Sequence, residues 1–465
     1  MPTPLPTQAP ARPLAQALAE AIRTWDRRHV LRVEVAAEPA DPLLWLAAQT
    51  GAPASYWRGR GEAEAVASVG EALRAEVPSL ASTDAVADVL RQLPARSRIV
   101  ATARFDAAAL ALAGRKRAGD EWAAFGAARF VLPRIEFRSD GGRATLAVHL
   151  APGEPARVAA EAIAALRPAL SAEPDALPLP FMRRDDPDRA EWDRMLRWSL
   201  GAFERGDLDK VVLARRARFT FDEAVDAVVL LRLLEAATPR CYHALVAPDG
   251  LDGPAFLTAT PERLLRLDGR ELQTEAVAGT RPRSDADDAD DRLRDELLAS
   301  DKDQREHAYV RDAIAGAVAP LATELDVDGA ASAMTLARGR HLRTGVRATL
   351  DDGVGPLDVL RALHPTPAVG GTPSPAALDA IDRLEPFDRG LYAGVVGWVG
   401  RDADGAEAAD LAVGIRSGLA HGRTLSLYSG AGIVAGSDPG AEWAEIEHKI
   451  GDFARVLGLT TASEA

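Results

Sequence analysis

Two different periods of hydrophobic and polar residues run along the chain. Alternation of apolar and polar positions predicts strands at residues 31–36, 130–138 and 144–150, and a further strand is expected at residues 210–219. Apolar residues spaced three and four apart predict helices at residues 14–25, 227–237, 290–318, 355–365, 374–385 and 442–457. Short segments bounded by Gly, Pro and Asp predict further strands at residues 241–247, 255–261, 263–269, 271–279, 390–400, 410–420 and 424–434. Many short strands interrupted irregularly by helices favour an α+β fold with large antiparallel sheets over a doubly wound parallel sheet.

The pattern is interrupted at residues 170–187, where four prolines lie and no long apolar period continues. We interpret this stretch as a connection. The connection divides the rest of the chain into three parts. We expect a disordered tail at residues 1–13, an N-terminal α+β half at residues 14–169 and a second half at residues 188–460. Asp186 is expected to cap the helix that follows the connection.

Composition and charge narrow the class of protein. With 47% hydrophobic and 27% charged residues among 465, the chain has the composition of a globular protein with a large core. A net charge of −14 argues against a nucleic-acid partner, and no window approaches eighteen uninterrupted apolar residues, so we expect no membrane span. The one cysteine, Cys241, excludes an intrachain disulfide and fits a reducing compartment, so we expect a cytoplasmic protein.

Two pairs of carboxylates recur with the same helical spacing. Asp303 and Glu306 share one face of a predicted helix, and Glu442 and Glu445 share one face of another. If the two helices face each other, the four acids repel unless a hard divalent cation such as Mg²⁺ neutralises them. Either pair alone is typical of a solvated helix face. We expect Lys302 and Arg305 to point away from the acidic face.

Two further residues have the chemistry of an acid and a base. Lys210 opens a predicted strand, where loss of hydration favours the neutral amine that a general base needs. Glu262 follows a strand and could stay protonated as a general acid. Each also has an ordinary interpretation, because a lysine beside a strand and a carboxylate in a turn are common surface features.

Small and polar residues near strand ends are candidates for binding an anion. Gly279 and Thr280 end one strand, and Gly430 and Gly432 precede the second carboxylate helix, so backbone N–H groups there could approach a carboxylate. Arg416 is predicted to lie within a strand among apolar residues, where it needs an anionic partner, either a structural acid or a substrate.

Taken in order, these motifs resemble the chorismate-utilising enzymes, which include anthranilate synthase component I, aminodeoxychorismate synthase, isochorismate synthase and salicylate synthase. The resemblance is strong over residues 190–460. The segments that carry it are KVVLAR, TATPERL, EAVAGTRPR, SDKDQREH, LHPTPAVGG, FDRGLYAGVVGW, VGIRSG, YSGAGIVAGSDP and EWAEIEHK. It implies large antiparallel sheets packed as a sandwich with helices outside, forming a single large chorismate-binding domain completed by the N-terminal half.

The resemblance also implies an activity. The branches of this family that add ammonia lack lysine at the position of Lys210, so its presence indicates water as the nucleophile. The implied reaction is the isomerisation of chorismate to isochorismate, closest to the menaquinone-type synthases. The alternatives are a siderophore-pathway isochorismate synthase, a salicylate synthase that also eliminates pyruvate, and a non-catalytic chorismate- or metal-binding relative. We expect a monomer or homodimer with no amidotransferase subunit.

The roles that the resemblance implies cover the whole candidate site. Lys210 would activate water and Glu262 would protonate the departing hydroxyl group. Mg²⁺ would sit on Glu306 and Glu445, with its waters held by Glu442 and by Asp303, where the family usually has glutamate. The substrate would be held by Gly279, Thr280, His364, Ala368, Tyr392, Arg416, Gly430, Gly432 and Lys449.

Overall fold

The computed structural model describes residues 11–108, 121–171, 177–283, 287–336 and 339–459. In the N-terminal half the helices are α1 (Ala11–Ala21), α2 (Pro42–Ala48), α3 (Asp84–Arg91) and α4 (Ala156–Ala164). The strands of that half are β1 (Leu31–Ala37), β2 (Ala54–Arg58), β3 (Ala65–Val77), β4 (Arg98–Ala103), β5 (Ala128–Ser139) and β6 (Ala144–Leu150).

The second half holds more elements. Its helices are α5 (Arg189–Glu204), α6 (Ala227–Ala237), α7 (Asp287–Ala299), α8 (Asp301–Val318), α9 (Pro356–Leu363), α10 (Ser374–Leu384) and α11 (Pro439–Val456). Its strands are β7 (Pro180–Asp186), β8 (Lys210–Phe221), β9 (Tyr242–Ala247), β10 (Ala255–Thr260), β11 (Arg263–Asp268), β12 (Glu271–Pro282), β13 (Ala322–Val327), β14 (Ser332–Thr335), β15 (Gly339–Leu350), β16 (Gly371–Thr372), β17 (Val395–Arg401), β18 (Glu407–Val413), β19 (Ser417–His421) and β20 (Thr424–Val434).

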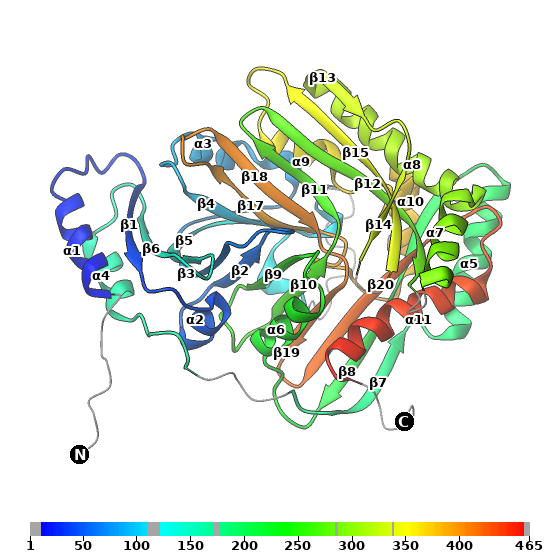
Figure 1. Cartoon of the computed structure of the whole chain (residues 1–465), viewed down its shortest axis with the longest axis horizontal. Coiled ribbons are helices and arrows are strands. Elements are labelled where there is room, and N and C mark those ends of the chain that lie inside the picture. Colours follow the sequence, from blue (N-terminus) through cyan, green and yellow to red (C-terminus); the bar gives the residue numbers. More distant parts are fainter. Residues whose placement is uncertain (1–10, 109–120, 172–176, 284–286, 337–338, 460–465) are drawn as a thin grey trace.

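Antiparallel pairing joins the two halves into one sheet network. Strand β2 pairs with β9, and β4 pairs with β17, so strands of the N-terminal half lie between or beside strands of the second half. Every described pairing is antiparallel, as in β8 with β20 and β12 with β15. Figure 1 shows α5, α7, α8 and α11 outside the strands of the second half. The predicted α+β fold with helices outside antiparallel sheets is therefore confirmed, and the N-terminal half completes the sheets.

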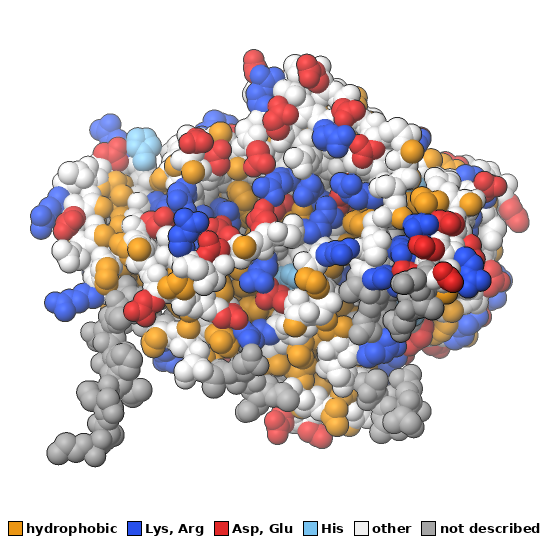
Figure 2. Space-filling model, viewed as in Figure 1, with side chains coloured by type: hydrophobic (Ala, Val, Ile, Leu, Met, Phe, Trp, Pro, Cys, Tyr) orange, Lys and Arg blue, Asp and Glu red, His pale blue; other side chains and the backbone are white. Residues whose placement is uncertain are grey.

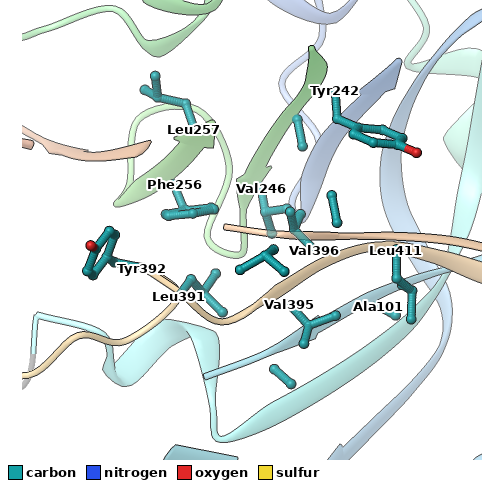
Figure 3. Close-up of a cluster of buried hydrophobic side chains, with 14 of the residues drawn as sticks. Ala101, Tyr242, Val246, Phe256, Leu257, Leu391, Tyr392, Val395, Val396 and Leu411 are labelled. Carbon is teal, nitrogen blue, oxygen red and sulfur yellow. The ribbon is translucent and has the colours of Figure 1, made fainter. Parts of the chain in front are cut away.

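One hydrophobic core spans both halves. Figure 3 shows Ala101 of β4 close to Val395, Val396 and Leu411 of the second half, and all four side chains are buried. The surface in Figure 2 carries acidic and basic side chains of both signs interspersed. Within the described part of the chain, no helix combines the length and the apolar character needed to cross a membrane.

Three sequence predictions about the chain path need correction. The connection at residues 170–187 contains strand β7, which pairs with β8, and helix α1 begins at Ala11, inside the expected tail. The helix after the connection is capped by Asp188, whose carboxylate accepts from the Glu191 N–H group, and not by Asp186. Residues 1–10 of the expected tail lie outside the described residues.

The long helix expected at residues 290–318 is two helices. Helix α7 ends at Ala299 and α8 begins at Asp301. Between them Ser300 has an extended backbone, and its side chain accepts from the N–H group of Asp303, which is an N-cap. The cap fixes the start of the helix that carries Asp303 and Glu306.

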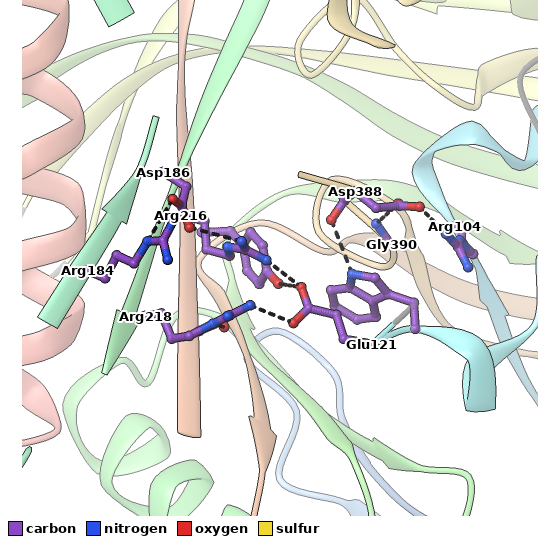
Figure 4. Close-up of polar contacts among 11 residues, drawn as sticks. Arg104, Glu121, Arg184, Asp186, Arg216, Arg218, Asp388 and Gly390 are labelled. Carbon is purple, nitrogen blue, oxygen red and sulfur yellow. Dashed lines mark hydrogen bonds and ion pairs between the residues drawn. The ribbon is translucent and has the colours of Figure 1, made fainter. Parts of the chain in front are cut away.

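Residues of the N-terminal half also reach the strands that carry candidate site residues. The Glu121 carboxylate accepts from Arg216 at 2.7 Å and from Arg218 at 3.0 Å, both on β8, as Figure 4 shows. It also accepts from the hydroxyl of Tyr428 on β20 at 3.2 Å, and the Tyr428 ring stacks on the Tyr392 ring. This contact fixes β8, β20 and Tyr392 relative to one another.

Gly390 packs against Trp122 in the N-terminal half. Its replacement by alanine is expected to lower the free energy of unfolding by about 3 kcal/mol or more. Its φ is 53°, and an added Cβ would lie 1.9 Å from the buried ring of Trp122. Gly405→Ala is the matched control, because Gly405 also has a positive φ but nothing lies within 4 Å of an added Cβ. Denaturant unfolding should show a loss of only about 1 kcal/mol for the control. Equal losses would mean that the Trp122 contact has no effect.

Candidate active site

Most of the candidate site residues line one cavity of about 170 Å³. They come from the β10–β11 junction, β12, α8, β20, α11 and the loops before β16, β17 and β19. Those that line it are Glu262, Gly279, Thr280, Asp303, Glu306, Ala368, Tyr392, Arg416, Gly430, Gly432, Glu442, Glu445 and Lys449. Lys210 contacts this wall, since its Nζ lies 3.1 Å from Oε1 of Glu306.

Each of the four predicted metal-ligating carboxylates pairs with a cation of the chain. The pairs are Asp303 with Arg281 at 2.7 Å, Glu306 with Lys210 at 3.1 Å, Glu442 with Lys302 at 2.7 Å and Glu445 with Lys449 at 2.7 Å. Helices α8 and α11 therefore do bring their acidic faces to one cavity. The repulsion expected among four converging acids is offset here by four basic side chains.

The same donors suit a hard divalent cation. Carboxylate oxygens are the ligands that Mg²⁺ prefers, and all four acids line the same cavity. Among the described residues no three His, Cys, Asp or Glu side chains are grouped closely enough to hold an ion, because each acid is turned to its own cation. The residues fit Mg²⁺ in kind and number.

Lys302 belongs to the site, contrary to the sequence prediction that it points elsewhere on the helix. It lines the cavity and donates to Glu442 at 2.7 Å. The signal was present in the sequence, because Lys302 and Glu306 are four residues apart and so share a helix face. A second residue that sequence reasoning missed is His341 on β15, whose Nδ1 lies 3.1 Å from both Oγ1 of Thr280 and the carbonyl oxygen of Gly279. No pattern in the sequence indicates it.

Glu262 has the environment of a protonated acid. It lies between β10 and β11 with 4% of its surface exposed. Burial, reinforced by the charge of Glu275 and opposed by Lys210, raises the pKa of Glu262 to about 8. A carboxyl group with this pKa carries its proton at neutral pH and can donate it.

Lys210 is the second candidate for acid–base chemistry. It is the first residue of β8, and its side chain is fully buried. Apart from the ion pair with Glu306, its Nζ has no hydrogen-bond partner among the described residues. A buried amine with spare hydrogen-bonding capacity next to a cavity is suited to act on a small polar molecule there.

The part of the cavity that was predicted to bind an anion departs from the sequence prediction at one point. Arg416 does not lie in the middle of a strand; it follows β18 and precedes β19, with a φ of 48°. The strand expected at residues 410–420 is broken there, and the turn presents Arg416 to the cavity. Gly279 also has a positive φ, 72°, at the bulge where β12 shifts its register against β15.

Two histidines lie outside the cavity lining. His364 is buried, and its Nε2 lies 3.1 Å from the backbone oxygen of Arg104. It lines a separate cavity beside α8 and α10, so the structure does not bring it together with the other candidate residues. His307 is buried against Thr344, with 2.7 Å between Nε2 and Oγ1, which agrees with the structural role expected for it.

Known proteins resemble this chain over most of its length. The sequence profile described as chorismate binding enzyme matches residues 16–458. Isochorismate synthase MenF of Escherichia coli is 33% identical over 428 residues, which is 90% of this chain and 91% of that one. Isochorismate synthase EntC of the same organism is 34% identical, over 60% of this chain and 69% of that one.

Solved structures give the same result. The menaquinone-specific isochorismate synthase MenF of E. coli superposes with a TM-score of 0.81 at 31% identity, covering 96% of this chain and 99% of that one. Anthranilate synthase component I of Streptococcus pneumoniae superposes with a TM-score of 0.68 at 18% identity, which shows a shared fold. From the matched profile and the extent of the MenF similarity, we conclude that the chain belongs to the family of chorismate-binding enzymes.

Proposed function

We propose that this protein is a Mg²⁺-dependent isochorismate synthase, an isomerase that converts chorismate to isochorismate. One observation carries the proposal: a buried lysine and a carboxyl group with a raised pKa meet at one cavity, as Lys210 and Glu262 do. A water-adding isomerisation needs one group that takes a proton and one that gives a proton. The family relatives named above support chorismate as the substrate.

Lys210 acts as the base in this mechanism. As a base it takes a proton from water, and the resulting hydroxide forms a bond to C2 of the chorismate ring. The ring double bonds shift as the C4–O bond breaks. Glu262 gives its proton to the departing C4 hydroxyl group, which leaves as water. One water enters and one leaves, so the product is an isomer and no redox cofactor is needed.

The remaining residues hold the two carboxylates of the substrate. Arg416 and Tyr392 are suited to the enolpyruvyl carboxylate, because they line the same cavity and each offers a donor. The backbone at Gly279 and Gly432 and the ammonium group of Lys449 are suited to the ring carboxylate. His364 has no role in this mechanism, because it lies outside the cavity lining.

Glu306 and Glu445 would hold Mg²⁺ directly, with Glu442 and Asp303 holding its waters. When bound, the ion would supply positive charge at the ring carboxylate of the substrate. Support comes from the kind and number of oxygen donors at the cavity and from the space that Gly432 leaves. An added Cβ at Gly432 would lie 2.1 Å from Oε1 of Glu306.

Gly432→Ala is therefore expected to lower Mg²⁺ affinity by about 10- to 100-fold, because the new methyl group displaces the Glu306 carboxylate. Calorimetric titration of the folded protein with Mg²⁺ measures this without substrate. Gly451→Ala on α11 is the matched control, since nothing lies within 4 Å of its added Cβ. A Gly432→Ala protein that binds Mg²⁺ like the control would remove Glu306 from the proposed metal site.

The test of the proposed function is incubation of the purified protein with chorismate, with and without Mg²⁺, followed by chromatographic identification of the product. Isochorismate formed only with Mg²⁺ is the expected result. Salicylate and pyruvate would identify a salicylate synthase instead, and recovery of unchanged chorismate would overturn the assignment. The menaquinone type is favoured over the siderophore type because the MenF similarity spans 90% of this chain and the EntC similarity 60%.

A further inference from the structure

A chamber of about 570 Å³ adjoins the catalytic cavity and has more than three times its volume. It lies among the C-terminal end of α6, helix α11 and the residues around Gly339 at the start of β15. The two spaces share six lining residues, which are Pro261, Thr280, Arg281, Arg416, Glu445 and Lys449. They are therefore adjacent spaces with a common wall, and the proposed chemistry uses only the smaller one.

The charge of the chamber is opposite to that of the protein. Its described lining includes five basic side chains, Arg240, Arg281, Arg283, Arg416 and Lys449, but a single carboxylate, that of Glu445. The chain as a whole has a net charge of −14, and the face in Figure 2 mixes both signs. A concave region lined by one sign of charge concentrates ions of the other sign, here anions that the protein as a whole repels.

Arg240 differs from three other basic side chains of this lining, each of which has a carboxylate partner. Arg281 pairs with Asp303, Arg283 lies 3.3 Å from Asp290, and Lys449 pairs with Glu445. Arg240 is exposed in the turn that follows α6 and donates to the backbone oxygen of Thr335 at 3.0 Å. No carboxylate among the described residues forms an ion pair with it.

The rest of the lining is apolar. Leu234, Leu336, Phe453 and Val456 contribute to the chamber wall beside the basic side chains. An inorganic anion gains nothing from such a wall, whereas a ring that carries a carboxylate can bury its apolar body there while its charge faces the arginines. The lining therefore selects for an organic ring carboxylate.

We propose that this chamber is a collecting site, at which an anionic ring carboxylate binds before it enters the catalytic cavity, and that Arg240 supplies the charge that attracts it. The proposal rests on the proposed function for the identity of its ligand, the dicarboxylate chorismate. Arg240 is not part of the acid–base or metal machinery, so its contribution is to affinity and not to the chemical step.

The test compares Arg240→Gln and Arg240→Glu, which remove one and two units of positive charge, with the control Arg143→Glu. Arg143 lies in the turn between β5 and β6 with 92% of its side chain exposed, and it does not line the chamber. At low ionic strength KM for chorismate should rise about threefold for Arg240→Gln and about tenfold for Arg240→Glu, with kcat unchanged. The differences should disappear in about 0.5 M salt, where the Debye length falls to a few ångströms.

Equal KM values for Arg240→Glu and Arg143→Glu would overturn the proposal, as would a rise in KM that persists in high salt. A measurement without chorismate separates this failure from failure of the proposed function. Cys241, the one cysteine of the chain, also lines the chamber, so its modification can be followed without background. It is buried, and burial raises the pKa of its thiol to about 11, so the slow reaction is followed at alkaline pH. The rates at which Cys241 reacts with the anionic disulfide dithionitrobenzoate and with the neutral disulfide dithiodipyridine report the electrostatic potential in the chamber.

Any change in the reactivity of the thiol affects both rates equally, so it does not change the ratio of the rate with the anionic disulfide to the rate with the neutral one. It should fall about threefold or more in Arg240→Glu and stay at the wild-type value in Arg143→Glu. An unchanged ratio in Arg240→Glu would overturn the chamber as an anion-collecting site. If the ratio falls but chorismate is not turned over, the chamber stands and the proposed function fails.

Discussion

Replacement of Lys210 by alanine is expected to lower kcat for isochorismate formation by at least about 10³-fold, because the attacking water loses the base that deprotonates it. The fold should survive. Lys210 lies at the first residue of β8, and its side chain makes a single ion pair, with Glu306. The measurement is turnover of chorismate at saturating Mg²⁺, with the circular dichroism spectrum as a check on folding.

Two further experiments separate the role of base from the role of charge. Lys210→Arg keeps a positive charge beside Glu306, but a guanidinium cannot be deprotonated near neutral pH, so this variant should be as inactive as Lys210→Ala. A small primary amine such as ethylamine, added to Lys210→Ala, should restore part of the turnover by filling the vacated space. Activity of Lys210→Arg above about a tenth of wild type would contradict the assignment of Lys210 as the base.

The sequence allowed much of this site to be predicted because its chemistry is local. Spacing of three residues places Asp303 with Glu306, and Glu442 with Glu445, on single helix faces, and the structure brings both faces to one cavity. The ordered motifs indicate the family, and the matched profile confirms it. Helices and strands with a strong period, such as α6 and β6, lie where the period predicts.

What could not be predicted depends on contacts between distant segments. The pairing of β2 with β9 and of β4 with β17 joins residues more than 180 positions apart, and no local pattern specifies such a register. At two points the structure also differs from what the spacing of hydrophobic residues predicts, because a cap or a turn interrupts the expected element. Ser300 breaks a continuous helical pattern by capping α8, and the turn at Arg416 interrupts an apolar run that looks like one strand. His364 shows the converse, since it lies within a family motif but its ring is held by the backbone of Arg104, outside the cavity lining.

Glu262→Gln is expected to abolish turnover to a similar degree, because the amide cannot protonate the leaving hydroxyl group. In the wild type, Glu262 acts as an acid only while it is protonated. With a pKa of about 8 in the free protein, kcat/KM should be level at neutral pH and fall about tenfold for each pH unit above about 8. The pH dependence of kcat/KM between pH 6 and 10 measures this limb.

The same raised pKa affects stability, and the sign follows from linkage. Protonated Glu262 is the form that the buried site favours, so its contribution to stability is fully present below the ordinary pKa of 4.5 and is lost as the pH rises to about 8. Glutamine cannot ionise, so Glu262→Gln should unfold at higher denaturant concentration than the wild type at pH 9, by a free energy on the order of a few kcal/mol. A protein that loses activity while gaining alkaline stability is not inactive through misfolding.

Asp410→Asn is the matched control for both effects. Burial raises the pKa of Asp410 to about 7, but this carboxyl group lies on β18 and does not line the catalytic cavity. Its substitution should also raise stability at pH 9, since a buried charge is again removed, but it should leave kcat and the alkaline limb near pH 8 in place. If Asp410→Asn abolished that limb, or if Glu262→Gln kept substantial turnover, the titrating acid would be a different group. An inactive Glu262→Gln with an intact limb in Asp410→Asn assigns the role of proton donor to Glu262.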